Sequence, residues 1–252
     1  MIEIFILSLI QGIAEFLPVS SSSHLIIVSK FIKFEAQSLA IDVSLHVGSF
    51  LAVISYFYKD IINFVKNKNL LIKIFFSSIP VIICGYLLVE TSLINNLRNI
   101  KIIGWTTLIF GILLYISDKF KLEGSIKENF NLKSVTIISL FQVLSLIPGV
   151  SRSGITITAA RLLNFKRYDS AKISFLMSIP TLGAVSIFGV YNILYAEDQK
   201  FSNLNLLSIL LSFSFSLITI KFFLKFIQKS NLNLFVIYRV LLGLVLLIFA
   251  YL

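Results

Sequence analysis

The chain has 252 residues, of which 57% are hydrophobic and 13% charged, and its formal net charge is +10. Soluble domains carry about 25% charged residues, so this composition excludes an ordinary soluble fold and favours an integral membrane protein. The basic residues lie in short clusters between apolar runs, which indicates loops that face anionic lipid headgroups and argues against a nucleic-acid partner.

The first apolar stretch, residues 3–17, is short for a membrane crossing. It runs into Pro18 and the serines at 20–23, and a second apolar piece follows at 25–32. This pattern predicts a helical hairpin that enters the membrane and turns back. A full crossing needs about 20 mostly apolar residues, and three such stretches follow, at 41–58, 71–90 and 101–117.

The second half repeats this order. Residues 134–147 run into a Pro-Gly and Ser-Arg-Ser-Gly segment at 148–154, and a further apolar piece lies at 155–163. This pattern predicts a second hairpin. Three long apolar stretches complete the chain, at 173–195, 206–227 and 234–252.

The four prolines are shared equally between the halves. Pro18 and Pro148 end the first arm of each hairpin, and Pro80 and Pro180 lie within spans. We therefore predict an all-α membrane protein with six transmembrane helices and two re-entrant helical hairpins in an inverted repeat. It would form one membrane domain over 1–252, with halves at approximately 1–118 and 119–252. The breaks would then meet at the functional site. The alternative is that the breaks only end helices at prolines.

Lysines and arginines are unevenly divided between the two sides of this layout. One side carries 15 of the 22, in loops near 59–73, 119–133, 161–172 and 221–229. The other side carries 5, near 30–33, 98–101 and 200. The positive-inside rule makes the first side cytoplasmic, with both termini outside. Arg152 and Arg239 are left within the membrane.

Ionisable groups at membrane depth are costly and usually functional. Glu15 follows Gln11 by four residues, which places both side chains on one helix face. Arg152 stands at the second break between Ser151 and Ser153. The alternative is a purely structural Glu15–Arg152 ion pair.

The serines at 20–23 are followed directly by His24. Hydroxyls near a histidine suit a nucleophile–base pair or an anion site at a helix start, although a serine run alone is more often a helix cap. His46, with Asp42 four residues before it, is the type of isolated histidine that is usually structural. With Arg152 as a phosphate-binding fork, these groups suggest an intramembrane site for a phosphate-bearing lipid.

Two segments carry a resemblance to a known family. They are QGIAEFLPVSSSSH at 11–24 and PGVSRSGIT at 148–156. Both resemble the motifs of undecaprenyl-diphosphate phosphatases of the bacitracin-resistance type, in the same order, and the likeness extends over nearly the whole chain. The resemblance implies removal of the terminal phosphate of undecaprenyl diphosphate. This reaction recycles the lipid carrier for peptidoglycan synthesis, cell-wall biogenesis and cell shape, and it opposes bacitracin.

The resemblance also implies roles for particular residues. The catalytic set would be Glu15, Ser21, His24 and Arg152, and either Ser21 or His24 would attack phosphorus. Substrate binding would fall to Gln11, Ser20, Ser22, Ser151, Ser153 and Thr156. Glu15 would also bind a divalent cation, Mg²⁺ or Ca²⁺.

The chain departs from the family pattern at two positions. Ser23 stands where the family usually has glycine, a residue that adopts positive φ at little cost. Gln11 stands where many members have glutamate, so the first motif has one carboxylate fewer for a metal.

The expected partners are undecaprenyl diphosphate and membrane lipids, in a bacterial cytoplasmic (inner) membrane that the chain crosses several times. The oligomeric state stays open, with a homodimer as one alternative. The rival function is a polyprenyl-phosphate transporter or flippase, which an inverted repeat would also suit.

Overall fold

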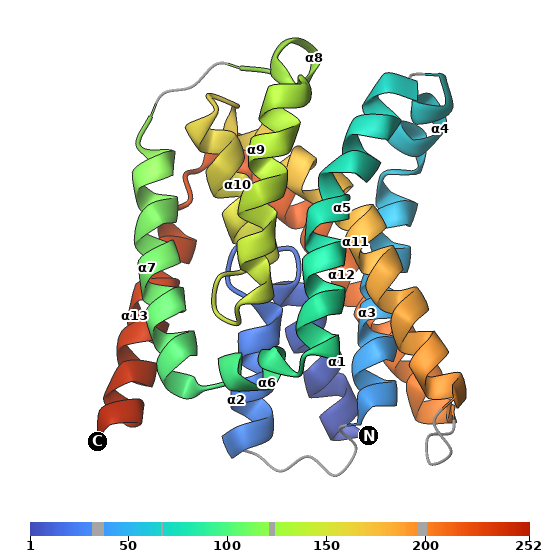
Figure 1. The fold of residues 1–252 in the computed structure, drawn as a ribbon, viewed down its shortest axis with the longest axis vertical. Helices are drawn as coiled ribbons and strands as arrows, with labels where there is room; N and C mark the ends of the chain where they lie inside the picture. The colour runs from blue at the N-terminus through green and yellow to red at the C-terminus, as the bar shows by residue number, and fades with distance from the viewer. Residues whose placement is uncertain (32–37, 67, 121–123, 196–200) are drawn as a thin grey trace.

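The computed structural model describes residues 1–31, 38–66, 68–120, 124–195 and 201–252, and the ordered elements there are helices (Figure 1). Six helices are long and apolar enough to cross a membrane. They are α3 (Leu39–Tyr56), α5 (Lys68–Glu90), α7 (Ile100–Asp118), α11 (Arg167–Tyr195), α12 (Asn203–Lys229) and α13 (Asn233–Tyr251). The six-span prediction is confirmed, and the chain is a multi-pass membrane protein.

Three shorter helices lie in the connections: α4 (Tyr58–Lys66), α6 (Leu93–Leu97) and α8 (Ile126–Asn129). Pro80 and Pro180 lie inside α5 and α11, as predicted. Much of the outer surface is apolar: Phe75, Phe76 and Ile83 of α5 are about half exposed or more. Such side chains suit contact with lipid tails, because lipid gives no drive to bury them.

The spans pack closely through small residues. A Cβ added to Gly48 of α3 would lie 2.5 Å from the Ile209 carbonyl oxygen of α12. On the same interface, the Ser49 hydroxyl lies 3.0 Å from that of Ser216 and 3.2 Å from that of Ser212. Small residues and interhelical hydroxyl contacts hold helices together in membranes, where the hydrophobic effect between helices is absent. The α3–α12 pair is thus closely packed, and α12 also contacts α1, the helix before the first break.

At each place where the sequence predicts a hairpin, a break separates two consecutive helices. The first pair is α1 (Ile2–Ala14) and α2 (Ser21–Phe31). The second is α9 (Leu132–Val143), extended by the 3₁₀ turn Leu144–Leu146, and α10 (Arg152–Leu162). The two pairs extend from opposite ends of the molecule toward its middle (Figure 1). Return of each pair to its own membrane face, and the inverted repeat, stay predictions.

The two breaks contact each other directly. The Ser153 hydroxyl donates to the Leu17 carbonyl at 2.7 Å. Ser20 and Ser151, the residues directly before α2 and α10, have φ of 75° and 71°. Both chain reversals therefore occur in the left-handed region, which non-glycine residues rarely adopt.

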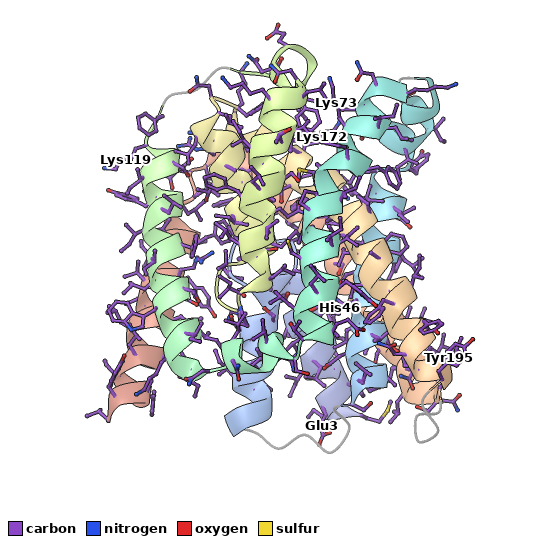
Figure 2. All side chains as sticks on the ribbon, in the orientation of Figure 1. Glu3, His46, Lys73, Lys119, Lys172 and Tyr195 are labelled. Atoms are coloured by element: carbon purple, nitrogen blue, oxygen red, sulfur yellow. The ribbon has the colours of Figure 1, made fainter. Side chains whose placement is uncertain are left out.

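Three lysines of the predicted cytoplasmic loops gather at one end of the molecule, and the orientation itself stays a prediction. Lys73, Lys119 and Lys172 lie near one end of the molecule, and Glu3 and Tyr195 near the other (Figure 2). Lys33, Lys121 and Lys200, which belong to the predicted loops, lie outside the described residues.

The lysine-rich end also holds a buried ionic cluster. Asp118 pairs with Arg161 at 3.3 Å and with Arg167 at 2.7 Å, and it accepts from the Leu232 amide at 3.0 Å. This cluster ties α7, α10 and α11 to the turn before α13.

Candidate active site

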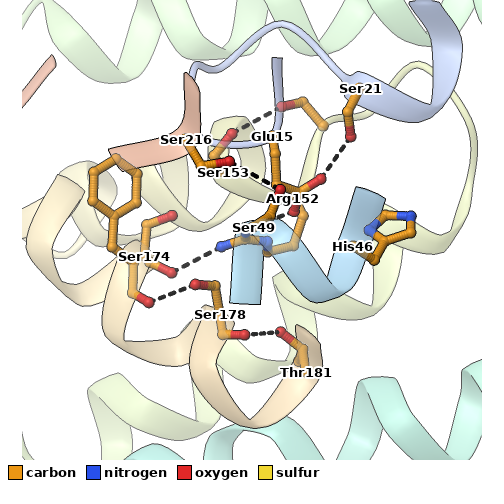
Figure 3. Close-up of polar contacts among 12 residues, drawn as sticks. Glu15, Ser21, His46, Ser49, Arg152, Ser153, Ser174, Ser178, Thr181 and Ser216 are labelled. Atoms are coloured by element: carbon orange, nitrogen blue, oxygen red, sulfur yellow. Dashed lines mark hydrogen bonds and ion pairs between the residues drawn. The ribbon is translucent and has the colours of Figure 1, made fainter. Parts of the chain in front are cut away.

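Glu15 is the centre of a hydrogen-bonded set at the first break. Its carboxylate accepts from Arg152 Nη2 at 2.8 Å, from the Ser21 hydroxyl at 2.7 Å and from Gln11 Nε2 at 3.2 Å. Only 8% of Glu15 is exposed. Ser21 and Arg152 both contact this carboxylate (Figure 3). Gln11 and Glu15 lie on one helix face, as predicted. Glu15 and Arg152 form the ion pair that was expected under the structural alternative.

Local backbone geometry brings Ser21 to Glu15. Helix α1 ends at Ala14, and the chain turns through Pro18 before Ser20, whose φ of 75° redirects it into α2. Ser21 is the first residue of α2, and its hydroxyl thereby reaches back to a residue six positions earlier. The serine run opens a helix and also delivers a hydroxyl to the carboxylate.

Arg152 is positioned from the second break and from α11. Its Nη1 donates to the Ser174 carbonyl at 3.0 Å. Thr156, one turn further along α10, donates to the Ser174 hydroxyl at 2.7 Å. Ser151 caps α10 by accepting from the Gly154 amide at 3.1 Å. No motif surrounds Ser174, so its role could not be predicted from the sequence.

The remaining serines of the first motif differ in their surroundings. Ser20 is buried and its hydroxyl lies 3.0 Å from that of Ser23, whereas Ser22 is exposed and lies 3.4 Å from Ser20. Ser23 is fully buried inside α2, and its φ is not positive. A glycine is therefore not needed there, because the unusual φ belongs to Ser20.

His24 is directed away from Ser21 in this structure. Its Nδ1 lies 2.6 Å from the Ser20 carbonyl, which can only accept, so Nδ1 carries the proton. Its Nε2 then accepts from the Tyr238 hydroxyl, and the two rings stack. The hydrogen bonds described for His24 reach neither Glu15 nor Ser21.

His46 belongs to the site, although as an isolated histidine it was expected to be structural. Its Nδ1 lies 3.1 Å from Gln11 Nε2. Gln11 thus uses its amide nitrogen toward both His46 and Glu15, and its buried Oε1 has no hydrogen-bond partner among the residues that the structure describes. In the sequence, only the four-residue spacing between Asp42 and His46 pointed to a role for this histidine.

The residues fit a divalent cation only in part. Within the described ranges, no three His, Cys, Asp or Glu side chains gather as metal ligands. Glu15 offers carboxylate oxygens, and Gln11 offers an Oε1 with no partner among the described residues, on the amide whose nitrogen donates to Glu15. Such oxygens are the hard donors that Mg²⁺ and Ca²⁺ use. Two such ligands suffice only where substrate and water oxygens supply the others.

Comparison with known proteins covers nearly the whole chain. A sequence model of the family described as bacitracin resistance protein BacA matches residues 4–245, a range that includes both breaks. An undecaprenyl-diphosphatase of Pelagibacter ubique is 51% identical over 99% of this chain and 98% of that protein. Proteins with the same name from Saccharophagus degradans (40%, over 94% and 93%) and Jannaschia sp. (38%, over 98% of each) are also similar.

Proposed function

Because the chain belongs to the bacitracin resistance protein BacA family, we propose that it hydrolyses undecaprenyl diphosphate to undecaprenyl phosphate and inorganic phosphate. The observation that carries the proposal is the Glu15–Ser21–Arg152 contact set within a bundle of apolar helices. Relatives named undecaprenyl-diphosphatase support it. The reaction would return the lipid carrier to cell-wall synthesis and confer bacitracin resistance.

Arg152 would bind the diphosphate. Its guanidinium uses one N–H toward Glu15 and one toward Ser174, and a guanidinium has five N–H donors, so others stay available for phosphate oxygens. Ser151, Ser153 and Thr156 order the start of α10 around it. Backbone N–H groups at the starts of α2 and α10 would add donors, because the first turn of a helix leaves them unpaired.

Ser21 is the nucleophile in this proposal. A serine hydroxyl needs a base, and Glu15 lies 2.7 Å from it, whereas His24 is engaged by Ser20 and Tyr238. The Ser21 oxygen bonds to the terminal phosphorus, its proton passes to Glu15, and the bond from that phosphorus to the bridging oxygen breaks. Undecaprenyl phosphate leaves. Water then attacks the phosphoserine, and Glu15 returns its proton to the Ser21 oxygen as the bond between phosphorus and that oxygen breaks. Inorganic phosphate departs with the hydroxyl of the water, whose other proton passes to solvent.

Arg152 would stabilise the charge on the transferred phosphoryl group in both steps. Glu15 and the Gln11 Oε1 would hold Mg²⁺ or Ca²⁺ together with phosphate and water oxygens. Such an ion would neutralise phosphate charge.

The setting is the bacterial cytoplasmic membrane. With the lysine-rich end inside, both termini and the first hairpin would face outward. A homodimer stays a prediction, and the size of the purified protein in detergent would test it.

The test is phosphate release from undecaprenyl diphosphate by protein purified in detergent. The wild type should release phosphate, whereas a transporter or flippase would release none. Ser21→Ala should abolish turnover but keep lipid binding, because it removes only the attacking oxygen. The matched control is Ser23→Ala, which removes a neighbouring buried hydroxyl and should keep most activity. If Ser21→Ala stays active while His24→Ala is dead, His24 is the nucleophile and the assignment to Ser21 is wrong.

A further inference from the structure

Arg239, which lies in α13 outside both motifs, is a fully buried arginine. Its guanidinium donates to four backbone carbonyls. They are Gly149 at 2.8 Å, Val150 at 3.0 Å, Pro18 at 3.3 Å and Thr107 at 3.3 Å. Three of the four belong to the helix breaks, and both breaks are represented.

These carbonyls need partners because the helices that would have satisfied them are interrupted. In a membrane interior, an unpaired carbonyl is strongly unfavourable, because no water is present to hydrogen-bond it. Space for the guanidinium is reserved by glycine: a Cβ on Gly154 would lie 2.8 Å from Arg239 Nη1, and one on Gly111 would lie 3.0 Å from Arg239 Cβ. Arg239 therefore fixes the position of Pro18, near Ser21, relative to Val150, near Arg152.

Charge gives a second reason to single out this residue. An arginine keeps its charge in proteins even when buried. The hydrogen bonds and ion pairs described for Arg239 reach carbonyls and no carboxylate, unlike those of Arg152, which pairs with Glu15. Among the described residues around the two breaks, Arg152 and Arg239 thus oppose a single buried carboxylate, that of Glu15. This leaves a surplus positive charge in a low-dielectric setting, where charges interact strongly.

We propose that Arg239 is a positioning residue that joins the two helix breaks and supplies the positive charge that the anionic diphosphate neutralises. It acts through the backbone on Ser21 and Arg152 and does not touch the substrate. The proposal rests on the proposed function, since it concerns the same site.

Two substitutions separate the two parts of the proposal. Arg239→Lys keeps the charge but loses the planar fork that reaches both breaks. Turnover should fall about 10²-fold, as expected when catalytic groups move by about 1 Å, while affinity should stay within about threefold. Arg239→Gln loses the charge as well, so affinity should also fall by about tenfold or more.

The affinity probe is methylenediphosphonate, a diphosphate analogue that cannot be hydrolysed, and its binding is measured by calorimetry in detergent. Turnover is measured with undecaprenyl diphosphate. The matched control is Arg161→Gln, because Arg161 is also a buried arginine that donates to backbone carbonyls, those of Phe165, Phe120 and Asp118. Arg161 lies at the other end of α10, so this variant should leave diphosphonate affinity unchanged.

Equal affinities for Arg239→Lys and Arg239→Gln would overturn the charge role, and normal turnover of Arg239→Lys would overturn the joining role. If Arg239→Gln does not fold, the ratio of turnover loss to affinity loss in Arg239→Lys still decides, because general damage would lower both. A wild type that binds the diphosphonate but releases no phosphate would refute the proposed function and leave the charge role of Arg239 intact.

Discussion

At the scale of single residues, Arg152 is the group whose geometry is hardest to replace. It contacts Glu15 and the Ser174 carbonyl through different nitrogens of one planar fork. Arg152→Ala should lower turnover about 10²–10³-fold, as loss of a key electrostatic donor does elsewhere. Arg152→Lys should also be badly impaired, because an ammonium keeps the charge without the fork. Phosphate release from the purified variants measures this, with the exposed Arg98→Ala as control. Near-normal turnover of folded Arg152→Ala would contradict the role.

Gln11 offers a test of the divalent cation. Its buried Oε1 has no hydrogen-bond partner in the described part of the chain and belongs to the amide whose nitrogen donates to Glu15. Affinity for hard cations rises with the charge of the ligands. Gln11→Glu should therefore lower the Mg²⁺ or Ca²⁺ concentration for half-maximal turnover on the order of tenfold. Gln11→Met, which has similar size and no oxygen, should raise it. Titration of chelator-treated protein with each ion is the measurement. Identical titrations for the two variants would exclude Gln11 as a ligand.

Sequence reasoning found some of the site residues and missed others for physical reasons. Helical spacing is fixed, so Gln11 and Glu15 could be placed on one face from their numbers alone. The direction of His24 could not be foreseen, because Tyr238, its partner, is 214 positions away. Arg239 was seen to lie inside the membrane, but its role depends on carbonyls that only the folded breaks bring together.

At the scale of elements, the second break depends on Gly149. Its φ is 98°, and a Cβ there would lie 1.9 Å from the Thr106 hydroxyl, which itself donates to the Pro148 carbonyl. Gly149→Ala should destabilise the protein by about 1–3 kcal/mol, the usual cost of a strained backbone position, and should lower turnover. Thermal unfolding in detergent measures the first effect and phosphate release the second.

The control for this change is Gly85→Ala in α5, where the nearest atom to an added Cβ is a Leu146 methyl at 3.3 Å. That neighbour is the end of a flexible side chain, and alanine is the better helix former. Gly85→Ala should therefore be neutral or mildly stabilising. Equal losses of thermal stability and turnover in Gly149→Ala and Gly85→Ala would show that the second break does not depend on Gly149 in particular.

The breaks themselves were predictable, but their geometry was not. Prolines and clustered serines mark the interruption of a helix, and both interruptions lie where those residues stand. Positive φ is ordinarily a property of glycine, which directed attention to Ser23. The structure instead gives positive φ to Ser20 and Ser151, in breaks that contact each other through Ser153 and the Leu17 carbonyl, a long-range contact that a sequence pattern does not encode.

At the scale of the whole molecule, orientation is the testable property. Ser125 lies by α8, and Ser202 directly precedes α12, at opposite ends of the molecule in Figure 1. In a Cys84→Ser background, a cysteine at 125 should be labelled only from the cytoplasm and one at 202 only from outside. Membrane-impermeant maleimide, applied to intact cells and to inverted vesicles, makes the measurement. Labelling of both positions from one side would refute the inverted repeat.

The six spans could be predicted because hydropathy over about 20 residues reports the bilayer directly. Their ends could not. The fourth span was expected from 173, whereas α11 begins at Arg167. The first turns of α11 carry Asp169 and Lys172, and their low hydropathy predicts a loop there. The structure has a helix instead, in which Lys172 pairs with Asp60 at 2.6 Å.

The long-range contact between Glu15 and Arg152 has a consequence for biosynthesis. The two residues are 137 positions apart, and ribosomes add about 5–20 residues per second, so roughly 7–27 s pass between the synthesis of Glu15 and that of its partner Arg152. Arg239 emerges later still, near the end of translation. A nascent chain thus holds Glu15 without its partner until Arg152 is made, and it holds the carbonyls of the two breaks without theirs until the last helix, which carries Arg239, arrives. During this interval, the polar groups of the first break would need insertion factors that shelter them from lipid.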